Sequence, residues 1–136
     1  MKLVRMSLGL ALLPLLLTTG FAADGPLFRC SAKDVIRLTE GGTVGRFGND
    51  SFQRDWTGVL INTSTGLIGR YDGSAERWAV IQEGSPDSDF VASPDRNLVS
   101  ASTQVLRIQT WAEKHRVTFL YFGLSMFVTG VCDEVR

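Results

Sequence analysis

The stretch that decides the fold is residues 117–132, VTFLYFGLSMFVTGVC. Its β-branched and aromatic residues predict two strands, 117–122 and 126–132, joined through Gly123-Leu124-Ser125. Apolar side chains occur on both faces of these strands, which is typical of central strands or of a closed sheet. Only about twelve residues of the stretch are apolar, against the roughly 20 that a membrane-spanning helix needs. We therefore expect no stable membrane insertion here.

Shorter strand-like runs precede this pair and are separated by Gly, Asn, Asp, Ser and Pro. Thr63-Ser64-Thr65-Gly66 predicts a hairpin between the runs on either side of it, and Asp72-Gly73 predicts the next turn. About eight short strands, spaced near ten residues apart, indicate an all-β fold, a small antiparallel barrel or sandwich. The earlier runs are residues 27–31, 35–38, 44–47, 55–62, 67–71 and 77–82.

Two segments leave this pattern. Residues 83–97 are rich in Asp, Gly and Pro and are irregular, interrupted only by the apolar residues 90–92. Residues 98–111 fit either a helix or a strand, because Val105, Ile108 and their apolar neighbours could form a helical stripe. The β-branched residues and the lack of a glycine stop favour a strand.

The chain has only two cysteines, Cys30 in the first strand-like run and Cys132 in the last. In an oxidising compartment, an even pair of thiols predicts a disulfide. Closing a barrel makes its first and last strands neighbours, so we expect the disulfide to join these two strands. Phe28 and Cys30 would then share an inward face.

The first 22 residues predict an export signal. Lys2 and Arg5 form a basic start, residues 6–17 an apolar stretch, and Gly20-Phe21-Ala22 a cleavage site. The residue directly after the cleavage site is Ala23 and not a cysteine, so we expect no lipid anchor. The expected product is a single domain over residues 23–136, periplasmic or secreted.

The composition of this domain argues against several functions. Twelve basic and 14 acidic residues remain once the signal's two basic residues are removed, so we expect neither nucleic acid nor a charged membrane surface as partner. The single histidine, His115, lies in a charged turn, and no G-x-S-x-G motif occurs. Asp87 and Asp89 lack the glycine and glutamate of an EF-hand loop. We predict no catalytic residues, no metal site and no cofactor.

Two kinds of residue are candidates for binding. Tryptophans in a small barrel usually fill the interior, but at an open mouth they would hold an apolar ligand or a partner's side chain. Residues beside a hairpin turn would form an exposed contact patch. The first kind comprises Trp56, Trp78 and Trp111, and the second comprises Ser64, Arg70 and Tyr71.

In outline, the chain resembles two groups of β-barrels. Asp55-Trp56-Thr57-Gly58 is similar to the Gly-x-Trp element of the calycin group, in reverse order. Phe28-Arg29-Cys30 with Cys132 resembles the periplasmic inhibitors of C-type lysozyme. The Ser-Gly-x-x-Tyr element of those inhibitors has a different spacing from Ser64 to Tyr71 here. Both resemblances imply a small barrel, and neither assigns the chain to a family.

Three functions follow from these observations, in order of preference. The first is a soluble, exported, non-catalytic barrel that binds a small apolar ligand or a protein partner. The second is an inhibitor of an extracellular hydrolase such as lysozyme, acting through residues 64–71. The third is a hydrolase with dispersed carboxylates, for which Asp55 is the nearest candidate. A roomy interior would favour ligand carriage, whereas a filled interior with a protruding hairpin would favour inhibition.

N-terminal sequencing of the exported protein checks the predicted signal. We expect the mature chain to begin at Ala23, or at Asp24 if the peptidase accepts Phe21, because Gly20-Phe21-Ala22 ends the leader. A membrane-bound product that retains Met1 would contradict the prediction.

Overall fold

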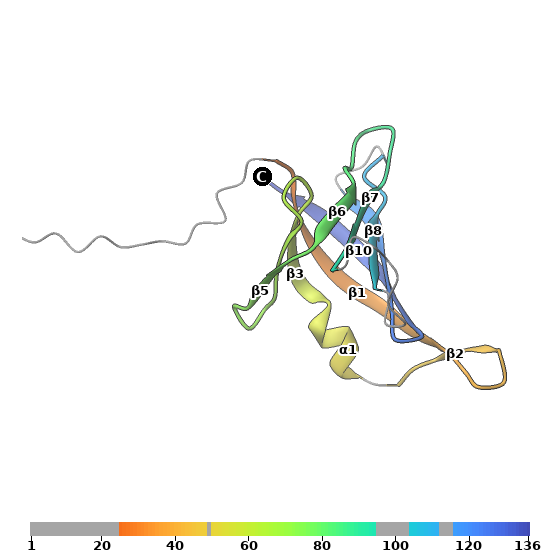
Figure 1. The fold of residues 1–136 in the computed structure, drawn as a ribbon. Coiled ribbons are helices and arrows are strands. Elements are labelled where there is room, and N and C mark those ends of the chain that lie inside the picture. Colours follow the sequence, from red (N-terminus) through yellow and green to blue (C-terminus); the bar gives the residue numbers. More distant parts are fainter. Residues whose placement is uncertain (1–24, 49, 95–103, 112–115) are drawn as a thin grey trace, which may run out of the picture.

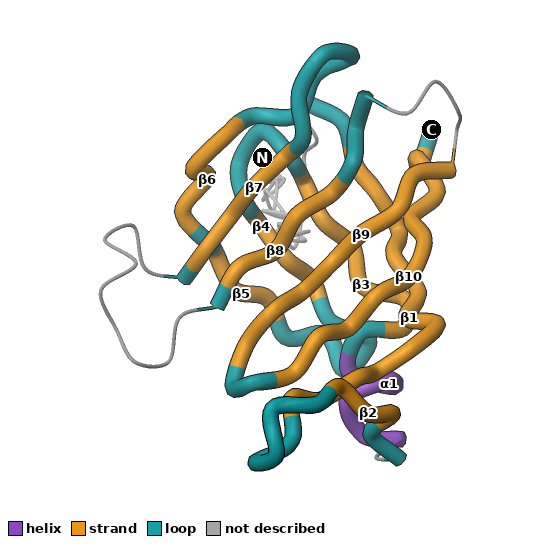
Figure 2. The backbone as a smooth tube through the Cα atoms, turned by 90° about the vertical axis from the view of Figure 1, so that its right-hand side faces the viewer, coloured by secondary structure: helices purple, strands orange, loops and turns teal. Residues whose placement is uncertain are grey.

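A computed structural model describes residues 25–48, 50–94, 104–111 and 116–136, which form one antiparallel sheet rolled into a nearly closed barrel (Figures 1 and 2). The order of the strands in the sheet is β5-β4-β3-β1-β10-β9-β8-β7-β6, and β2 pairs with β1 beside this path. No helix in the described ranges is long and apolar enough to span a membrane. The elements are β1 (Leu27–Leu38), β2 (Val44–Arg46), α1 (Asp50–Asp55), β3 (Thr57–Asn62), β4 (Leu67–Gly69), β5 (Ala75–Arg77), β6 (Ala79–Gln82), β7 (Phe90–Ser93), β8 (Val105–Ile108), β9 (Arg116–Gly123) and β10 (Met126–Val135).

The predicted seam between the first and last strands is confirmed. β1 and β10 pair from Leu27↔Val135 to Arg37↔Met126, and Cys30 lies directly opposite Cys132. The two cysteines form a disulfide, and their Cα atoms are 3.9 Å apart. Both are completely buried, so the bond lies inside the barrel.

Side chains fill the interior of the barrel. The inward-facing residues of β1, β3, β4, β7, β8, β9 and β10 belong to a single buried cluster that includes Phe90 and the tryptophans Trp56 and Trp78. Alternation along β9 places Val117, Phe119 and Tyr121 inside. The prediction that tryptophans here belong to the core is therefore met by these two.

The outer face explains the second apolar pattern of residues 117–132. Phe122 and Phe127 are register partners on β9 and β10, and their ring centroids are 4.8 Å apart. Val105 on β8 and Ile36 on β1 extend this row across four strands. All four side chains are half-buried. A closed sheet with an apolar row outside accounts for the two-faced pattern.

The run at residues 55–62 was predicted as one strand, and its beginning is wrong. Asp55 ends the helix α1, and the strand β3 starts only at Thr57. A six-residue helix is too short to show a helical period in the sequence. It is held instead by tertiary contacts, among them the edge-to-face contact of Phe52 with Phe47 at 6.2 Å.

The first strand is longer than expected, and the run at 77–82 is divided. Residues 27–31 and 35–38 belong to the single strand β1, whose register shifts between Ala32 and Asp34. At Trp78 the chain passes from β5 to β6, and the backbone N–H of Trp78 donates to the carbonyl oxygen of Gly66. This step joins the two strands at the ends of the sheet through the backbone.

Most other predicted elements are confirmed. The hairpin between β3 and β4 forms as expected, as do β2, β9 and β10. Within the ambiguous segment 98–111, residues 105–108 form the strand β8. The irregular segment 83–97 contains the short strand β7. His115 lies outside the described residues.

Replacing both cysteines by alanine tests the seam. We expect Cys30→Ala/Cys132→Ala to lower the free energy of unfolding by roughly 2–5 kcal/mol, because the bond closes a long loop of the unfolded chain. Guanidinium chloride unfolding of the double variant and the oxidised protein measures the difference. Peptide mapping without reductant should show these two cysteines linked, and free thiols or an intermolecular bond would contradict the seam.

Candidate functional site

The structure separates the six predicted binding residues into different places. Trp56 and Trp78 are buried, each with 3% of its surface exposed, whereas Tyr71 is 69% exposed and Trp111 48%. Ser64 precedes β4 and Tyr71 follows it, so the two residues lie at opposite ends of that strand. They do not form a single hairpin tip.

Two pockets receive these residues. A pocket of about 880 Å³ contains Ser64 and Trp78 in its wall. Another, of about 360 Å³, brings together Trp56, Arg70 and Tyr71. Trp111 belongs to neither. The smaller pocket combines three of the six residues with a turn whose shape is held by hydrogen bonds, and we place the candidate site there.

The pocket is lined by residues from α1, from the turn between β4 and β5, and from β9. We call this turn, residues 70–74, the β4–β5 turn. Aromatic rings form much of the pocket wall. They come from α1, from the residue that follows it, from the turn and from β9: Phe52, Trp56, Tyr71 and Tyr121.

The shape of the β4–β5 turn follows from Asp72 and Gly73. The backbone N–H of Arg70 donates to the carbonyl oxygen of Ser74 at 2.8 Å. Gly73 adopts a φ of 83°, which glycine accepts without strain. The Asp72 carboxylate accepts hydrogen bonds from the N–H and the hydroxyl of Ser74, at 2.9 and 2.6 Å. These bonds fix the turn and leave Tyr71 pointing outward.

Arg70 anchors the turn to the barrel. Its guanidinium carbon lies 4.5 Å from the centre of the Trp56 ring, within the range of a cation–π contact. One terminal nitrogen donates to the carbonyl oxygen of Asp55 at 3.1 Å, and the other to Glu76 at 2.6 Å. Only 20% of this side chain is exposed. Arg70 is therefore a structural residue, in contrast to the exposed contact that the sequence predicts.

Beneath Arg70, stacked aromatic rings form the floor of the site. The Trp56 ring lies 4.5 Å from that of Tyr121 and 5.9 Å from that of Phe119, centre to centre. Trp78 meets Trp56 edge to face at 6.4 Å. Offset and edge contacts of this kind add stability beyond the burial of area. The floor is rigid.

Charges in the site are held by specific partners. Burial disfavours the charged form of Glu76, but the hydrogen bond from Arg70 and the nearby indole N–H of Trp78 outweigh it. The pKa of Glu76 therefore lies below its ordinary value of 4.5. The indole N–H of Trp78 has no acceptor at hydrogen-bond distance within the described residues.

The other two titrating groups shift in opposite directions. Hydrogen bonds from Ser74 lower the pKa of Asp72 and keep this exposed carboxylate ionised. Burial raises the pKa of Tyr121, which stays protonated and donates its hydroxyl hydrogen to Gln104 Oε1 at 3.0 Å. The site presents carboxylates at its rim and neutral rings in its wall.

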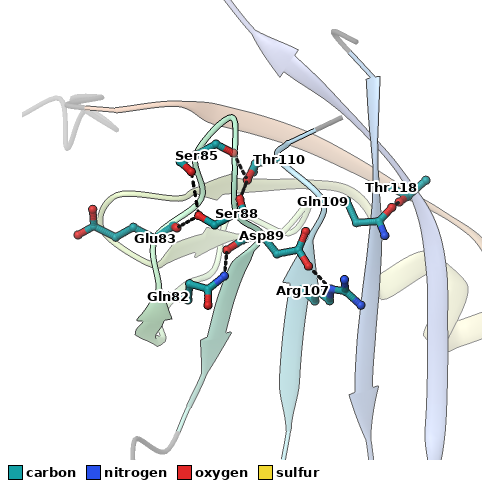
Figure 3. A network of polar contacts seen from close by, with 9 residues as sticks. All are labelled: Gln82, Glu83, Ser85, Ser88, Asp89, Arg107, Gln109, Thr110 and Thr118. Atoms are coloured by element: carbon teal, nitrogen blue, oxygen red, sulfur yellow. Dashed lines mark hydrogen bonds and ion pairs between the residues drawn. The ribbon is translucent and has the colours of Figure 1, made fainter. Parts of the chain in front are cut away.

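The acidic loop before β7 is a hydrogen-bonded structure (Figure 3). Ser85 and Ser88 bond to each other at 2.9 Å, and Thr110 donates to the Ser88 carbonyl oxygen at 2.6 Å. Asp89 forms an ion pair with Arg107, as Figure 3 shows. Within the described ranges, no three His, Cys, Asp or Glu residues are grouped to hold a metal ion.

Sequence reasoning missed several members of the site. Phe52 belongs to the unpredicted helix, and Tyr121 was assigned only to the strand. Glu76 lies between the predicted runs 67–71 and 77–82, in a segment that carried no functional signal. The sequence identifies Asp72 only as a turn residue and gives it no role in a site. The Asp-Gly pair is a signal for a turn of defined geometry, and here that turn lies next to Arg70 and Tyr71.

Comparisons with known proteins find no match to this chain among protein-family models, curated proteins or solved structures. The function must therefore follow from the site itself.

Glu76→Gln tests the ion pair that holds the turn. Because the pKa of Glu76 is lowered, its contribution to stability is present at neutral pH and is lost as the pH falls below 4.5. We expect the variant to be less stable than the parent by about 0.5–1 kcal/mol at pH 7, a small effect because the Glu76 side chain is 46% exposed. In acid, the stabilities of the two proteins should be nearly equal. Urea unfolding at several pH values measures this.

Glu40→Gln is the matched control, because Glu40 is an exposed glutamate without an ion pair among the described residues. It should show no such dependence on pH. A deficit of Glu76→Gln that persists unchanged in acid would contradict the role given to the ion pair.

Proposed function

We propose that the protein is an exported, non-catalytic β-barrel that binds a protein partner through the β4–β5 turn and its adjoining pocket. The observation that carries this proposal is the exposed Tyr71, held on a hydrogen-bonded turn beside a pocket. Tyrosine is enriched among the residues that contribute most to protein interfaces. The expected compartment is the periplasm or the medium.

The filled interior supports a protein partner over an enclosed ligand. Barrels that carry small apolar ligands hold them in a cavity between the strands. Here Trp56, Trp78, Phe90 and their neighbours pack against one another inside. An apolar ligand would have to displace these side chains, whereas a partner could use the barrel's end as it stands.

The rigidity of the turn also supports binding. Association costs free energy when loops must be ordered at an interface. In this protein, the bonds of Asp72 to Ser74 and of Arg70 to Glu76 order the turn before any partner arrives. A partner would therefore meet Tyr71 in a fixed position.

Inhibition of an extracellular hydrolase is the second candidate function. The projecting β4–β5 turn favours it, because a rigid projecting turn can enter the cleft of an enzyme (Figure 1). Such inhibition would use Tyr71 and Asp72 rather than residues 64–71 as a unit. An inhibition assay against secreted hydrolases distinguishes an inhibitor from a binder of another kind.

Tyr71→Ala tests the binding surface. The change should leave the free energy of unfolding within about 0.5 kcal/mol, because the side chain is exposed. The affinity of the variant for the partner should fall about tenfold or more, as expected when a tyrosine at the centre of an interface is removed. The partner is first captured from an extract of the native host and identified, and calorimetry with the purified pair then gives the affinity.

Trp111→Ala is the matched control, since Trp111 is the other strongly exposed aromatic residue among those that the structure describes and lies outside the pocket. This variant should bind the partner as the parent does. Equal binding by Tyr71→Ala and the parent would refute the role of the turn, and loss of binding only in Trp111→Ala would move the interface to the other end.

A further inference from the structure

The charges at the pocket point to the chemistry of its occupant. We propose that the pocket receives a cationic side chain, a lysine or an arginine, from the protein partner. This inference rests on the proposed function and specifies what the partner presents. Asp55 and Asp72 are the carboxylates that line the pocket.

The guanidinium of Arg70 also lines the pocket and attracts Asp72 weakly, but its ion pair is with Glu76 and not with either of these two carboxylates. It lies 2.6 Å from Glu76, which balances its charge, and its face is covered by Trp56. One of its terminal nitrogens also bonds to the Asp55 carbonyl oxygen. The guanidinium is therefore occupied by contacts within the barrel, and the pocket keeps the negative charge of Asp55 and Asp72.

Both carboxylates are able to accept a new donor. Asp72 uses Oδ1 for both of its bonds to Ser74, and its Oδ2 has no partner among the residues that the structure describes. The carboxylate of Asp55 has no hydrogen bond or ion pair among the described residues, and Asp55 is exposed. A lysine or arginine head group placed between them would gain charge-assisted hydrogen bonds.

The aromatic wall complements the same kind of occupant. Tyr71 is 69% exposed, and Phe52, which lines the same pocket, is half-buried. Ring faces attract cations, and they also pack against the methylene groups of lysine and arginine side chains. A carboxylate in this pocket would meet the rings without that attraction and would be repelled by Asp55 and Asp72.

The test uses the mature, disulfide-bonded domain and two small probes, ethylguanidinium and propionate. Ethylguanidinium represents the end of an arginine side chain, and propionate is an anion of similar size. Titration followed by amide NMR should show saturable shifts at Tyr71, Asp72 and Ser74 with ethylguanidinium alone. Saturable shifts of these amides with propionate instead would overturn the inference.

Asp55→Asn/Asp72→Asn removes both charges and keeps an oxygen that can accept the bonds from Ser74. We expect ethylguanidinium to bind this variant roughly threefold to tenfold more weakly, because two exposed ion pairs, each worth about 0.2–1 kcal/mol, are lost together. Asp87→Asn, an exposed aspartate outside the pocket, controls for general charge and should bind as the parent does. Unchanged binding by the double variant, or an equal loss in Asp87→Asn, would overturn the inference.

The proposed function fails separately. If Tyr71→Ala weakens binding of the partner and Asp55→Asn/Asp72→Asn does not, the turn is an interface and the cationic occupant is refuted. If the partner is insensitive to Tyr71→Ala, the proposed function is refuted whatever the small probes show.

Discussion

The pairing of β1 with β10, locked by the disulfide between Cys30 and Cys132, is the constraint on which the rest of the barrel depends. β1 is the one strand that also pairs with both β2 and β3 among the described residues. The strand that begins the domain thus joins the two halves of the sheet. Without this seam, β1–β5 and β6–β10 would be two separate sheets, each with an exposed edge and half a core.

A barrel filled in this way leaves no interior space for the proposed binding site, which lies at one end. Trp56, Phe119 and Tyr121 occupy the space in which a ligand-carrying barrel holds its ligand. The same packing gives Arg70 a flat ring to rest on and so fixes the turn that carries Tyr71. The core therefore contributes to the site indirectly: it determines the position of an exposed residue that belongs to a turn.

The sequence predicts the elements that depend on local pattern and misses those that depend on distant contacts. The disulfide, the paired strands β9 and β10, and the turn at Asp72-Gly73 all have local signals in residue type and spacing. Arg70 was predicted to be exposed, because its contacts with Asp55 and Trp56 involve residues 15 and 14 positions away. The helix α1 lacks a signal for the same reason, since tertiary packing holds it.

The disulfide also has a topological consequence. Together with the backbone between Cys30 and Cys132, a separation of 102 residues, it makes a covalent ring that contains every turn of the barrel. Proteases cut exposed turns first. One cut within this ring opens it but releases no fragment, because the two pieces stay linked through sulfur. A nicked β4–β5 turn would thus remain attached on both sides, and the molecule would survive damage that divides an ordinary chain into separate pieces.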